Sequence, residues 1–288
     1  MYALFFSLLF VTVFGYSMDS LDGQKWDGEF YNLHARPQLD AAKKHLEKIS
    51  FESCRSIADI GCGSGAITAQ IADKLPHIRV VGSDLSSDMI RAARKNHGSR
   101  ENLTFYEQDA QKFVGNNEFD MAVSFLTLHW VQDKPAFFHT LFKALTPGGK
   151  FYLTVGAKNP EIENLKKKFF EALFAQDPQW QFLMKTSMVT AHTALSSDEC
   201  LQLVRAAGFE NLEISEEIEN HSFATTHDLG NFVATFISGY KDIAALPAQK
   251  RAEFITTAAE LWTKECSGGK PSYTWANLVV KGNKPNLS

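Results

Sequence analysis

A glycine-rich segment at residues 59–65, Asp-Ile-Gly-Cys-Gly-Ser-Gly, constrains the fold of this chain more than any other feature. It follows an apolar run over residues 56–60 that we expect to be a strand. It precedes residues 66–74, in which Ile67 and Ile71 recur at helical spacing. A glycine-rich turn between the first strand and the first helix is where open α/β sheets bind nucleotide-like ligands. The segment therefore predicts a ligand site as well as a fold.

Short apolar runs alternate with helical periods along the chain, which is typical of βαβ units and a parallel sheet. Runs such as Met121-Ala122-Val123 are continuously apolar, as expected for strands buried on both faces. We predict seven strands, over residues 56–60, 79–83, 103–106, 119–125, 151–155, 209–218 and 272–280. We predict helices over residues 38–50, 66–74, 86–95, 135–145, 160–174, 197–207, 226–246 and 248–266. The expected fold is α/β and Rossmann-like, with a mostly parallel seven-stranded sheet and helices on both faces.

Helical insertions interrupt the second half of the chain, at about residues 158–195 and 226–268, and we expect them to form a helical cap. Aromatic residues recur in them: Phe169, Phe170, Phe174, Trp180, Phe182, Phe232, Phe236 and Tyr240. Aromatic residues at helical spacing usually form the core between helices. They can also line a mostly apolar pocket under a cap. We expect both roles, with part of the aromatic face lining a pocket.

Composition excludes several classes of function. The 288 residues are 44% hydrophobic and 22% charged, which suits one large domain or one domain with an insertion. The formal net charge is -4, so no overall basic field favours nucleic acid as a partner. The four cysteines lie far apart and form no CxxC pair, which argues against a disulfide framework or a zinc site. We therefore predict no metal site.

Acidic residues at the strand ends distinguish between ligands. Gly61, Gly63 and Ala66 fit the GxGxxG/A spacing of dinucleotide-binding turns, and Asp84 lies at a suitable distance beyond them. Asp59, however, comes two residues before the first glycine, where a carboxylate would repel a pyrophosphate. It would instead suit the ammonium group of S-adenosylmethionine. The charge at this position therefore favours that cofactor over a dinucleotide.

Two further aspartates extend this argument. Asp84, after the second strand, can accept hydrogen bonds from both ribose hydroxyls. Asp109, after the third strand, can accept from the adenine amino group, with the Ala110 amide nearby. One such aspartate alone would more often be a strand-end cap or a turn residue. Three at successive strand ends on one sheet edge favour a cofactor site.

Motifs in a fixed order resemble those of class I S-adenosylmethionine-dependent methyltransferases and span about residues 26–156. The motifs are Asp59-Ile-Gly-Cys-Gly-Ser-Gly65, Val81-Gly-Ser-Asp84, Asp109-Ala110, Phe119-Asp120, Leu128-His-Trp130 and Leu145-Thr-Pro-Gly-Gly149. Ala58 departs from the family, which usually has a larger apolar residue there, and this affects packing rather than chemistry. The predicted cofactor contacts are Tyr31, Asp59, Gly61, Cys62, Gly63, Gly65, Asp84, Leu85, Met89, Asp109, Ala110 and Ser124.

Within this class the chain resembles the group that contains trans-aconitate, malonyl-carrier-protein and juvenile hormone acid methyltransferases. The resemblance rests on Trp26-Asp27 with Tyr31, on Pro37-Gln38 before a helix, and on residues 124–131, Ser-Phe-Leu-Thr-Leu-His-Trp-Val. Those relatives methylate carboxylates. The resemblance implies that Tyr31 belongs to a segment that folds over the cofactor.

The same resemblance implies that Gln38 and Trp130 hold the acceptor carboxylate through their N–H groups. Trp130 could equally be a buried core aromatic residue, and Gln38 a surface residue near a helix start. His129 could serve as a base, although a lone histidine beside an apolar strand end is more often structural. We therefore predict Gln38, Trp130 and His129 as the catalytic residues.

The expected function is O-methylation of a carboxylate on a small or carrier-linked acid. A carboxylate is already ionised near neutral pH and needs no base, and the sequence shows no convincing base constellation. One alternative is a methyltransferase with an N, C or phenolic O acceptor. Another is a protein that binds the cofactor without turnover. Asp59 and the Leu128-His-Trp130 motif oppose an NAD-dependent oxidoreductase.

The first 17 residues need an interpretation of their own. Leu4 to Tyr16 is almost entirely apolar but short for a bilayer, so we expect no stable membrane span. It resembles a signal-peptide core without the preceding positive charges. The alternative is that translation starts at Met18. We favour the latter because the cofactor is made and used in the cytosol, which predicts a domain over residues 18–288 and a cytoplasmic protein. A secreted or membrane-associated protein is the alternative.

Overall fold

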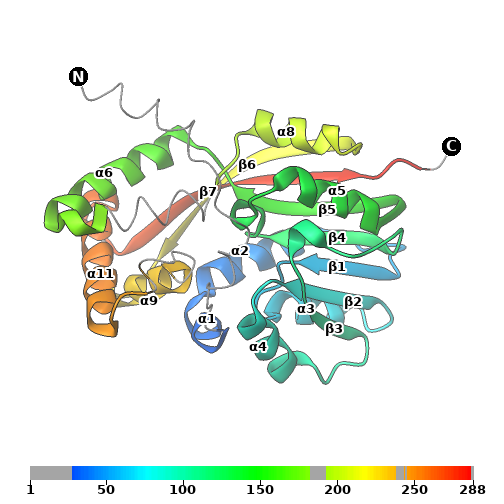
Figure 1. Cartoon of the computed structure of the whole chain (residues 1–288), viewed down its shortest axis with the longest axis horizontal. Helices are drawn as coiled ribbons and strands as arrows, with labels where there is room; N and C mark the ends of the chain where they lie inside the picture. The colour runs from blue at the N-terminus through cyan, green and yellow to red at the C-terminus, as the bar shows by residue number, and fades with distance from the viewer. Residues whose placement is uncertain (1–27, 182–192, 238–242, 244, 287–288) are drawn as a thin grey trace.

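The structure is a computed structural model that describes residues 28–181, 193–237, 243 and 245–286. A seven-stranded sheet forms its centre, in the order β3-β2-β1-β4-β5-β7-β6 (Figure 1). The strands are β1 (Ser56–Ile60), β2 (Arg79–Asp84), β3 (Leu103–Glu107), β4 (Phe119–Phe125), β5 (Leu145–Gly156), β6 (Glu210–Ser222) and β7 (Ser272–Asn283). Strands β1 to β5 pair in parallel, and β7 is antiparallel to both β5 and β6. The predicted α/β, Rossmann-like and mostly parallel sheet is confirmed.

Helices cover both faces of this sheet. The α-helices are α1 (Gly28–His34), α2 (Arg36–Leu46), α3 (Ala66–Lys74), α4 (Ser87–His97), α5 (Lys134–Ala144), α6 (Pro160–Gln176), α8 (Ser197–Ala206), α9 (Thr226–Ile237) and α11 (Ala248–Leu261). Short helical turns are η2 (Ala110–Lys112), η3 (Leu128–Trp130) and η4 (Trp262–Cys266). No helix among the described ranges is long and apolar enough to cross a bilayer. Residues 1–17, where a signal-like segment was considered, lie outside the described residues.

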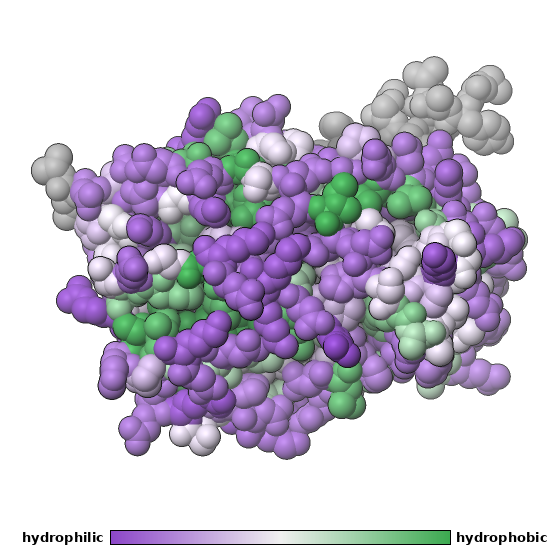
Figure 2. Space-filling model, turned by 180° about the vertical axis from the view of Figure 1, so that it is seen from behind, coloured by the Kyte–Doolittle hydropathy of each residue, from purple (hydrophilic) through white to green (hydrophobic). Residues whose placement is uncertain are grey.

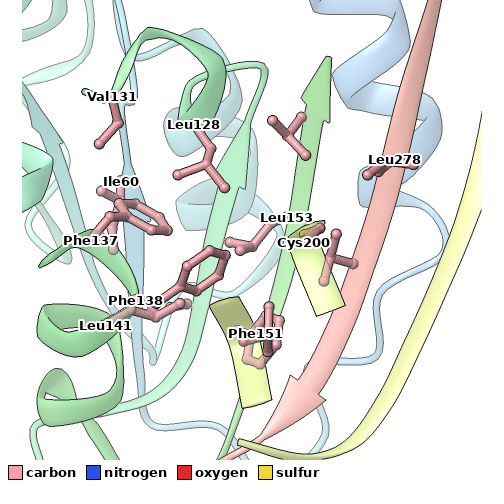
Figure 3. Close-up of a cluster of buried hydrophobic side chains, with 14 of the residues drawn as sticks. Ile60, Leu128, Val131, Phe137, Phe138, Leu141, Phe151, Leu153, Cys200 and Leu278 are labelled. Carbon is pink, nitrogen blue, oxygen red and sulfur yellow. The ribbon is translucent and has the colours of Figure 1, made fainter. Parts of the chain in front are cut away.

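Alternate side chains of the strands point to opposite faces of the sheet and pack in two separate hydrophobic cores. On one face, Phe137, Phe138 and Leu141 of α5 are completely buried against side chains such as Phe151 and Leu153 of β5 (Figure 3). On the other face, α2, α3 and α4 pack on the intervening strand residues. Burial on both faces explains why the central strands are continuously apolar.

Most element boundaries differ from the prediction by a few residues, α1 was not predicted, and the two differences below have a clear physical reason. The second helix covers residues 36–46 rather than 38–50, with Pro37 in its first turn, where a missing N–H costs nothing. The fifth strand covers residues 145–156 rather than 151–155, because it begins directly after α5. Gly148 has a φ of +76° within it, and the pairing of β4 with β5 shifts register here. The Pro-Gly-Gly segment thus forms an irregular strand start rather than a separate loop.

A third core lies beside the carboxyl ends of the strands, between α6, α9 and α11, into which β7 extends (Figure 1). Trp180 meets Phe254 edge to face with ring centroids 5.4 Å apart, and Phe232 stacks on Trp275 at 6.1 Å. This is the predicted helical cap, and the described aromatic residues of the insertions form its core. Phe182 and Tyr240 lie outside the described residues.

The surface seen from behind is mostly polar, and hydrophobic residues gather on it in a few separate areas (Figure 2). Exposure of isolated apolar side chains is ordinary for a folded domain. The positions that carry the chemistry discussed below are instead at the carboxyl ends of the strands.

Candidate cofactor and acceptor site

The three glycines of the loop after β1 are required for different structural reasons. Gly61, Gly63 and Gly65 all have positive φ, at +78°, +54° and +82°. A Cβ atom at Gly61 would lie 2.2 Å from the Thr127 side chain, and one at Gly65 would lie 2.7 Å from the Phe105 ring. A Cβ at Gly63 would meet no described atom within 4 Å. Packing therefore requires two of these glycines, whereas the third leaves the backbone open to a ligand.

Asp84, at the end of β2, holds the open part of this loop. Its carboxylate accepts from the Gly63 amide at 2.9 Å and from the Ser86 amide at 2.9 Å. The Ser83 carbonyl accepts from the Gly61 and Cys62 amides at 2.7 and 2.8 Å. Burial raises the pKa of Asp84, and the two amides oppose this shift. The loop thus brings a carboxylate beside the backbone that a ligand can approach.

Asp59 is a second carboxylate at this edge and is only 2% exposed. Its Oδ2 accepts from Thr68 Oγ1 at 2.7 Å. Burial raises the pKa of Asp59 to about 7, the Thr68 hydroxyl opposes the shift, and the charge of Asp84 adds to it. Asp59 forms no ion pair with a lysine, arginine or histidine in the described part of the chain, so a bound ammonium group would stabilise its charged form. The predicted preference of this position for a cationic ligand therefore has a physical basis.

A cavity lies above the loop and reaches the N-terminal helices. It is lined by Tyr31, Gln38, Leu39, Ala42, Asp59, Gly61, Cys62, Gly63, Ser64, Ala66, Ile67, Phe125 and Leu126. Burial, and then the charge of Asp84, raise the pKa of Tyr31. Burial likewise raises the pKa of the Cys62 thiol, which donates to the Gly63 carbonyl at 3.6 Å. The segment that carries Tyr31 thus lies over the loop.

Gln38 joins this cavity to the helical cap. Its Nε2 donates to Thr235 Oγ1 of α9 at 3.1 Å. Its Oε1 is buried without a hydrogen-bond partner among the described residues. An amide oxygen only accepts hydrogen bonds, so Oε1 in this state favours a hydrogen-bond donor in the neighbouring space. Trp26, which the sequence resemblance places near this segment, lies outside the described residues.

The other predicted cofactor contacts lie after β2, after β3 and within β4. Asp109 caps η2, accepting from the Gln111 amide at 2.9 Å and from Gln111 Nε2 at 3.1 Å. Leu85 is 48% exposed, whereas Met89 is buried. Ser124 is buried and donates to the Ile60 carbonyl at 2.7 Å, so its hydroxyl joins two strands. Of these residues, Leu85 has the accessible side chain that could cover a ligand.

Two of the predicted catalytic residues lie on η3, directly after β4. Trp130 is half-buried and does not line the cavity described above. His129 is 7% exposed, and its Nδ1 accepts from the Gly156 amide at 3.2 Å. This hydrogen bond ties η3 to the end of β5, which suits a structural histidine. Gln38 is the predicted catalytic residue that the structure brings to the cavity, and the assignments of Trp130 and His129 stay predictions.

Several residues near the loop escaped the sequence analysis. Leu126 lines the cavity with a φ of +53°, and its amide is held by the Thr154 carbonyl and hydroxyl, both at 3.0 Å. Leucine rarely adopts this backbone region, so no local pattern indicates it. Thr68 of α3 donates to Asp59 from the next element, and Thr235 of α9 accepts from Gln38 across 197 residues. Only the fold could reveal these contacts.

Comparisons with known proteins agree with this geometry. Residues 57–149 match a family described as a methyltransferase domain. The chain is 31% identical over 131 residues to malonyl-[acyl-carrier protein] O-methyltransferase 2 of Ilyobacter polytropus, covering 46% of this chain and 49% of that protein. It is 35% identical over 134 residues to trans-aconitate 2-methyltransferase of Deinococcus radiodurans, covering 46% and 50%. The chain thus spans about half the length of these curated relatives.

A solved structure shares the fold. Phosphoethanolamine N-methyltransferase 2 of Haemonchus contortus, in complex with phosphomonomethylethanolamine and S-adenosylhomocysteine, superimposes with a TM-score of 0.52 at 18% identity. The match covers 87% of this chain and 53% of that one. At this identity the likeness concerns the fold. The matched family model, the names of the curated relatives and the fold thus all resemble those of methyltransferases.

Proposed function

We propose that this chain, whose residues 57–149 match a methyltransferase domain family, is an S-adenosylmethionine-dependent methyltransferase that acts on a carboxylate of a small or carrier-linked acid. The observation that carries the proposal is the buried carboxylate of Asp59 together with the partly buried carboxylate of Asp84, which accepts from the amide of the open Gly63. S-adenosylmethionine, when bound, supplies a methyl group on a positively charged sulfur.

The residues of the loop fit this cofactor. Asp59 would hold the ammonium group, which compensates for the cost of its burial. Asp84 would accept from the ribose hydroxyls, and Gly63 leaves room for the ligand to approach the backbone. A pyrophosphate would bring further negative charge beside these carboxylates, so a dinucleotide fits less well. The described groups thus favour a cationic ligand.

The carboxylate acceptor is supported by the chemistry around Gln38. Gln38 Nε2 donates one N–H to Thr235, and its second N–H can hold a carboxylate oxygen without removing a proton from it. Methyl transfer to an ionised carboxylate then requires alignment rather than a base. His129 Nδ1 already accepts a backbone hydrogen bond, which is in line with a reaction without a histidine base. The names of the two curated relatives, which methylate acids, point in the same direction.

A labelled-methyl transfer assay tests the acceptor class. The full chain would be incubated with methyl-labelled S-adenosylmethionine and matched substrates: malonyl-carrier-protein thioester, trans-aconitate, aliphatic acids, and phosphoethanolamine as an amine acceptor. We expect label transfer to an acid, and release of the label as methanol in mild base, because methyl esters hydrolyse readily. A base-stable product formed only from the amine would contradict the carboxylate proposal and leave the cofactor proposal intact.

Calorimetry tests the cofactor separately. S-adenosylmethionine and S-adenosylhomocysteine should both bind to the full chain, whereas NAD should not. Tighter binding of NAD than of S-adenosylhomocysteine would contradict the whole assignment, because it would reverse the charge argument at Asp59.

A further inference from the structure

A cluster of ionisable side chains lies far along the sheet from the glycine loop, where α2 packs against β6. Glu217, Glu219 and His221 occupy alternate positions of β6 and therefore share one face of the strand. His45 of α2 faces them. The ligand atoms of His45, Glu217 and Glu219 all lie within 4.8 Å of one another.

His45 is the central member of this cluster. It is 1% exposed, and its Nε2 is buried without a hydrogen-bond partner among the described residues. Its Nδ1 lies 2.9 Å from Tyr152 Oη on β5. If Nδ1 carries the proton and donates to that oxygen, Nε2 keeps a lone pair with which it can bind a cation. Histidine ligands of metals are commonly oriented in this way by a partner on the other ring nitrogen.

His221 adds a second orphaned atom. Its Nε2 is also buried without a partner in the described part of the chain. It lies 4.0 Å from Glu219 Oε2. Its ring stacks on Trp275 with centroids 4.7 Å apart, which fixes its plane. Two unpartnered imidazole nitrogens beside one carboxylate are unusual, because buried polar atoms are normally hydrogen-bonded.

Lys44 of α2 and Lys48, in the turn that follows it, neutralise the carboxylates. Lys44 Nζ lies 2.8 Å from Glu219 Oε1, and Lys48 Nζ lies 2.7 Å from Glu217 Oε1. The hydrogen bond to Glu219 raises the pKa of Lys44, and the hydrogen bond from Lys48 lowers the pKa of Glu217. The side chains of Lys44 and Lys48 are 52% and 40% exposed. Both can therefore turn into solvent if another cation takes their place.

We propose that His45, Glu217 and Glu219 form a binding site for a divalent transition metal, with Zn²⁺ as the best match to one imidazole and two carboxylate ligands. Zinc takes nitrogen and oxygen donors at about 2.0–2.2 Å, so its ligand atoms lie roughly 3.5 Å apart. Small side-chain rotations bring the three atoms from their present spacing to that geometry. His221 is placed to provide a fourth ligand or to hold a bound water.

The site would tie α2 to the strand at the edge of the sheet. Gln38 and His45 lie seven residues apart on α2, about 10 Å along the helix axis. The metal is therefore too far from Gln38 to take part in methyl transfer. It would instead fix the helix that presents Gln38 to the cavity, as structural metals do when they join separate elements. This inference is independent of the proposed function.

Titration of the metal-free full chain with Zn²⁺ tests the site. We expect one equivalent to bind and to raise the melting temperature, and Co²⁺ in its place to give visible absorption bands. His45→Gln and Glu219→Gln should each weaken binding at least tenfold. Tyr152→Phe should weaken it about ten- to a hundredfold, because the orienting partner of His45 is lost. Glu213→Gln, on the same strand but in an exposed pair with Lys281, is the matched control and should bind as the wild type does.

Substitution of a lysine should change Zn²⁺ affinity in the direction opposite to substitution of a ligand. Lys44→Gln removes a competing cation and should strengthen Zn²⁺ binding while it lowers the melting temperature of the metal-free protein. A cluster that consists of ion pairs alone would show the lower melting temperature without tighter binding. The proposal is overturned if no equivalent binds at micromolar Zn²⁺, or if His45→Gln and Glu219→Gln bind as tightly as wild type. Should His45→Gln fail to fold, Glu219→Gln and Lys44→Gln decide the question.

Discussion

The Asp84 carboxylate accepts a hydrogen bond from the Gly63 amide at 2.9 Å and so joins the end of β2 to the middle of the loop after β1. The same carboxylate accepts from Ser86, the residue that caps α4. The Asp84 side chain therefore holds both the loop and the residue before α4, next to the position proposed for the ribose. A ligand at the loop would meet a carboxylate that neighbouring amides already hold in place.

Asp84→Ala should weaken binding of S-adenosylhomocysteine about a hundredfold or more, because two hydrogen bonds to a charged group, each worth about 1.5–3 kcal/mol, are lost. Calorimetry measures the effect, and circular dichroism checks that the variant is folded. Asp88→Ala in the first turn of α4 is the matched control and should bind normally. Unchanged affinity in folded Asp84→Ala would remove Asp84 from the site.

Gly63→Ala should abolish cofactor binding with little effect on the fold. A Cβ here meets no described atom within 4 Å, so only the positive φ, at a cost of about 1–2 kcal/mol, affects stability. Gly268 has a φ of +60° in equally open space, so Gly268→Ala controls for strain alone. Chemical denaturation and calorimetry on both variants separate the two effects. Equal cofactor affinity in the two variants would contradict the assignment of Gly63.

The sheet and its helices were predictable from the sequence because strands buried on both faces are marked by short apolar runs. β1 and β4 have apolar centres, Ile57-Ala58 and Met121-Ala122-Val123, and Gly65 and Gly208 lie at helix boundaries. The helix over residues 66–74 was predicted to the residue. The start of β5 was missed because its pairing with β4 depends on a register shift around Gly148. Such irregular pairing follows from neighbouring strands and has no local pattern.

The loop of the candidate site was also predictable, since its glycines and aspartates are close in sequence. Contacts between distant elements were not. Gln38 meets Thr235 across 197 residues, and His45 faces Glu217 and Glu219 from another layer. We predicted no metal site because the sequence has no CxxC pair. That pattern tests for cysteine ligands and gives no information on ligands such as His45, Glu217 and Glu219. The alternate spacing of Glu217, Glu219 and His221 indicates that they share one face of a strand. It does not indicate that His45 of α2 packs against that face, because this contact depends on the tertiary fold.

Cofactor binding should release protons near neutral pH. Burial raises the pKa of Asp59 to about 7 in the free protein, and a bound ammonium group would lower it. At pH 7, binding of S-adenosylmethionine should therefore release about half a proton from Asp59, and affinity should rise with pH until this carboxyl is ionised. Calorimetry in buffers of different ionisation enthalpy measures the release.

The raised pKa of Asp59 also predicts the direction in which the stability of the folded chain changes with pH. Its pKa is higher in the folded chain than in the unfolded one, so the folded state binds more protons between about pH 4 and pH 7. The contribution of Asp59 to stability is therefore lost as pH rises through this window. Asp59→Asn should flatten this part of the pH profile and abolish proton release on binding. Equal proton release in the variant would assign the titration to another group.

Gln38→Glu distinguishes the acceptor classes by the direction of its effect. A second carboxylate beside a carboxylate acceptor is repulsive, so kcat/KM for an acid should fall about a hundredfold, and further than in Gln38→Ala, which loses only the amide donor. A cationic amine acceptor would instead react as well or better with Gln38→Glu. The dissociation constant of S-adenosylhomocysteine should stay unchanged in both variants. Thr235→Val is the control for the cap, because it removes the partner of Gln38 Nε2 and leaves the amide itself in place. If Gln38→Glu matches wild type on every acid, Gln38 does not hold the acceptor.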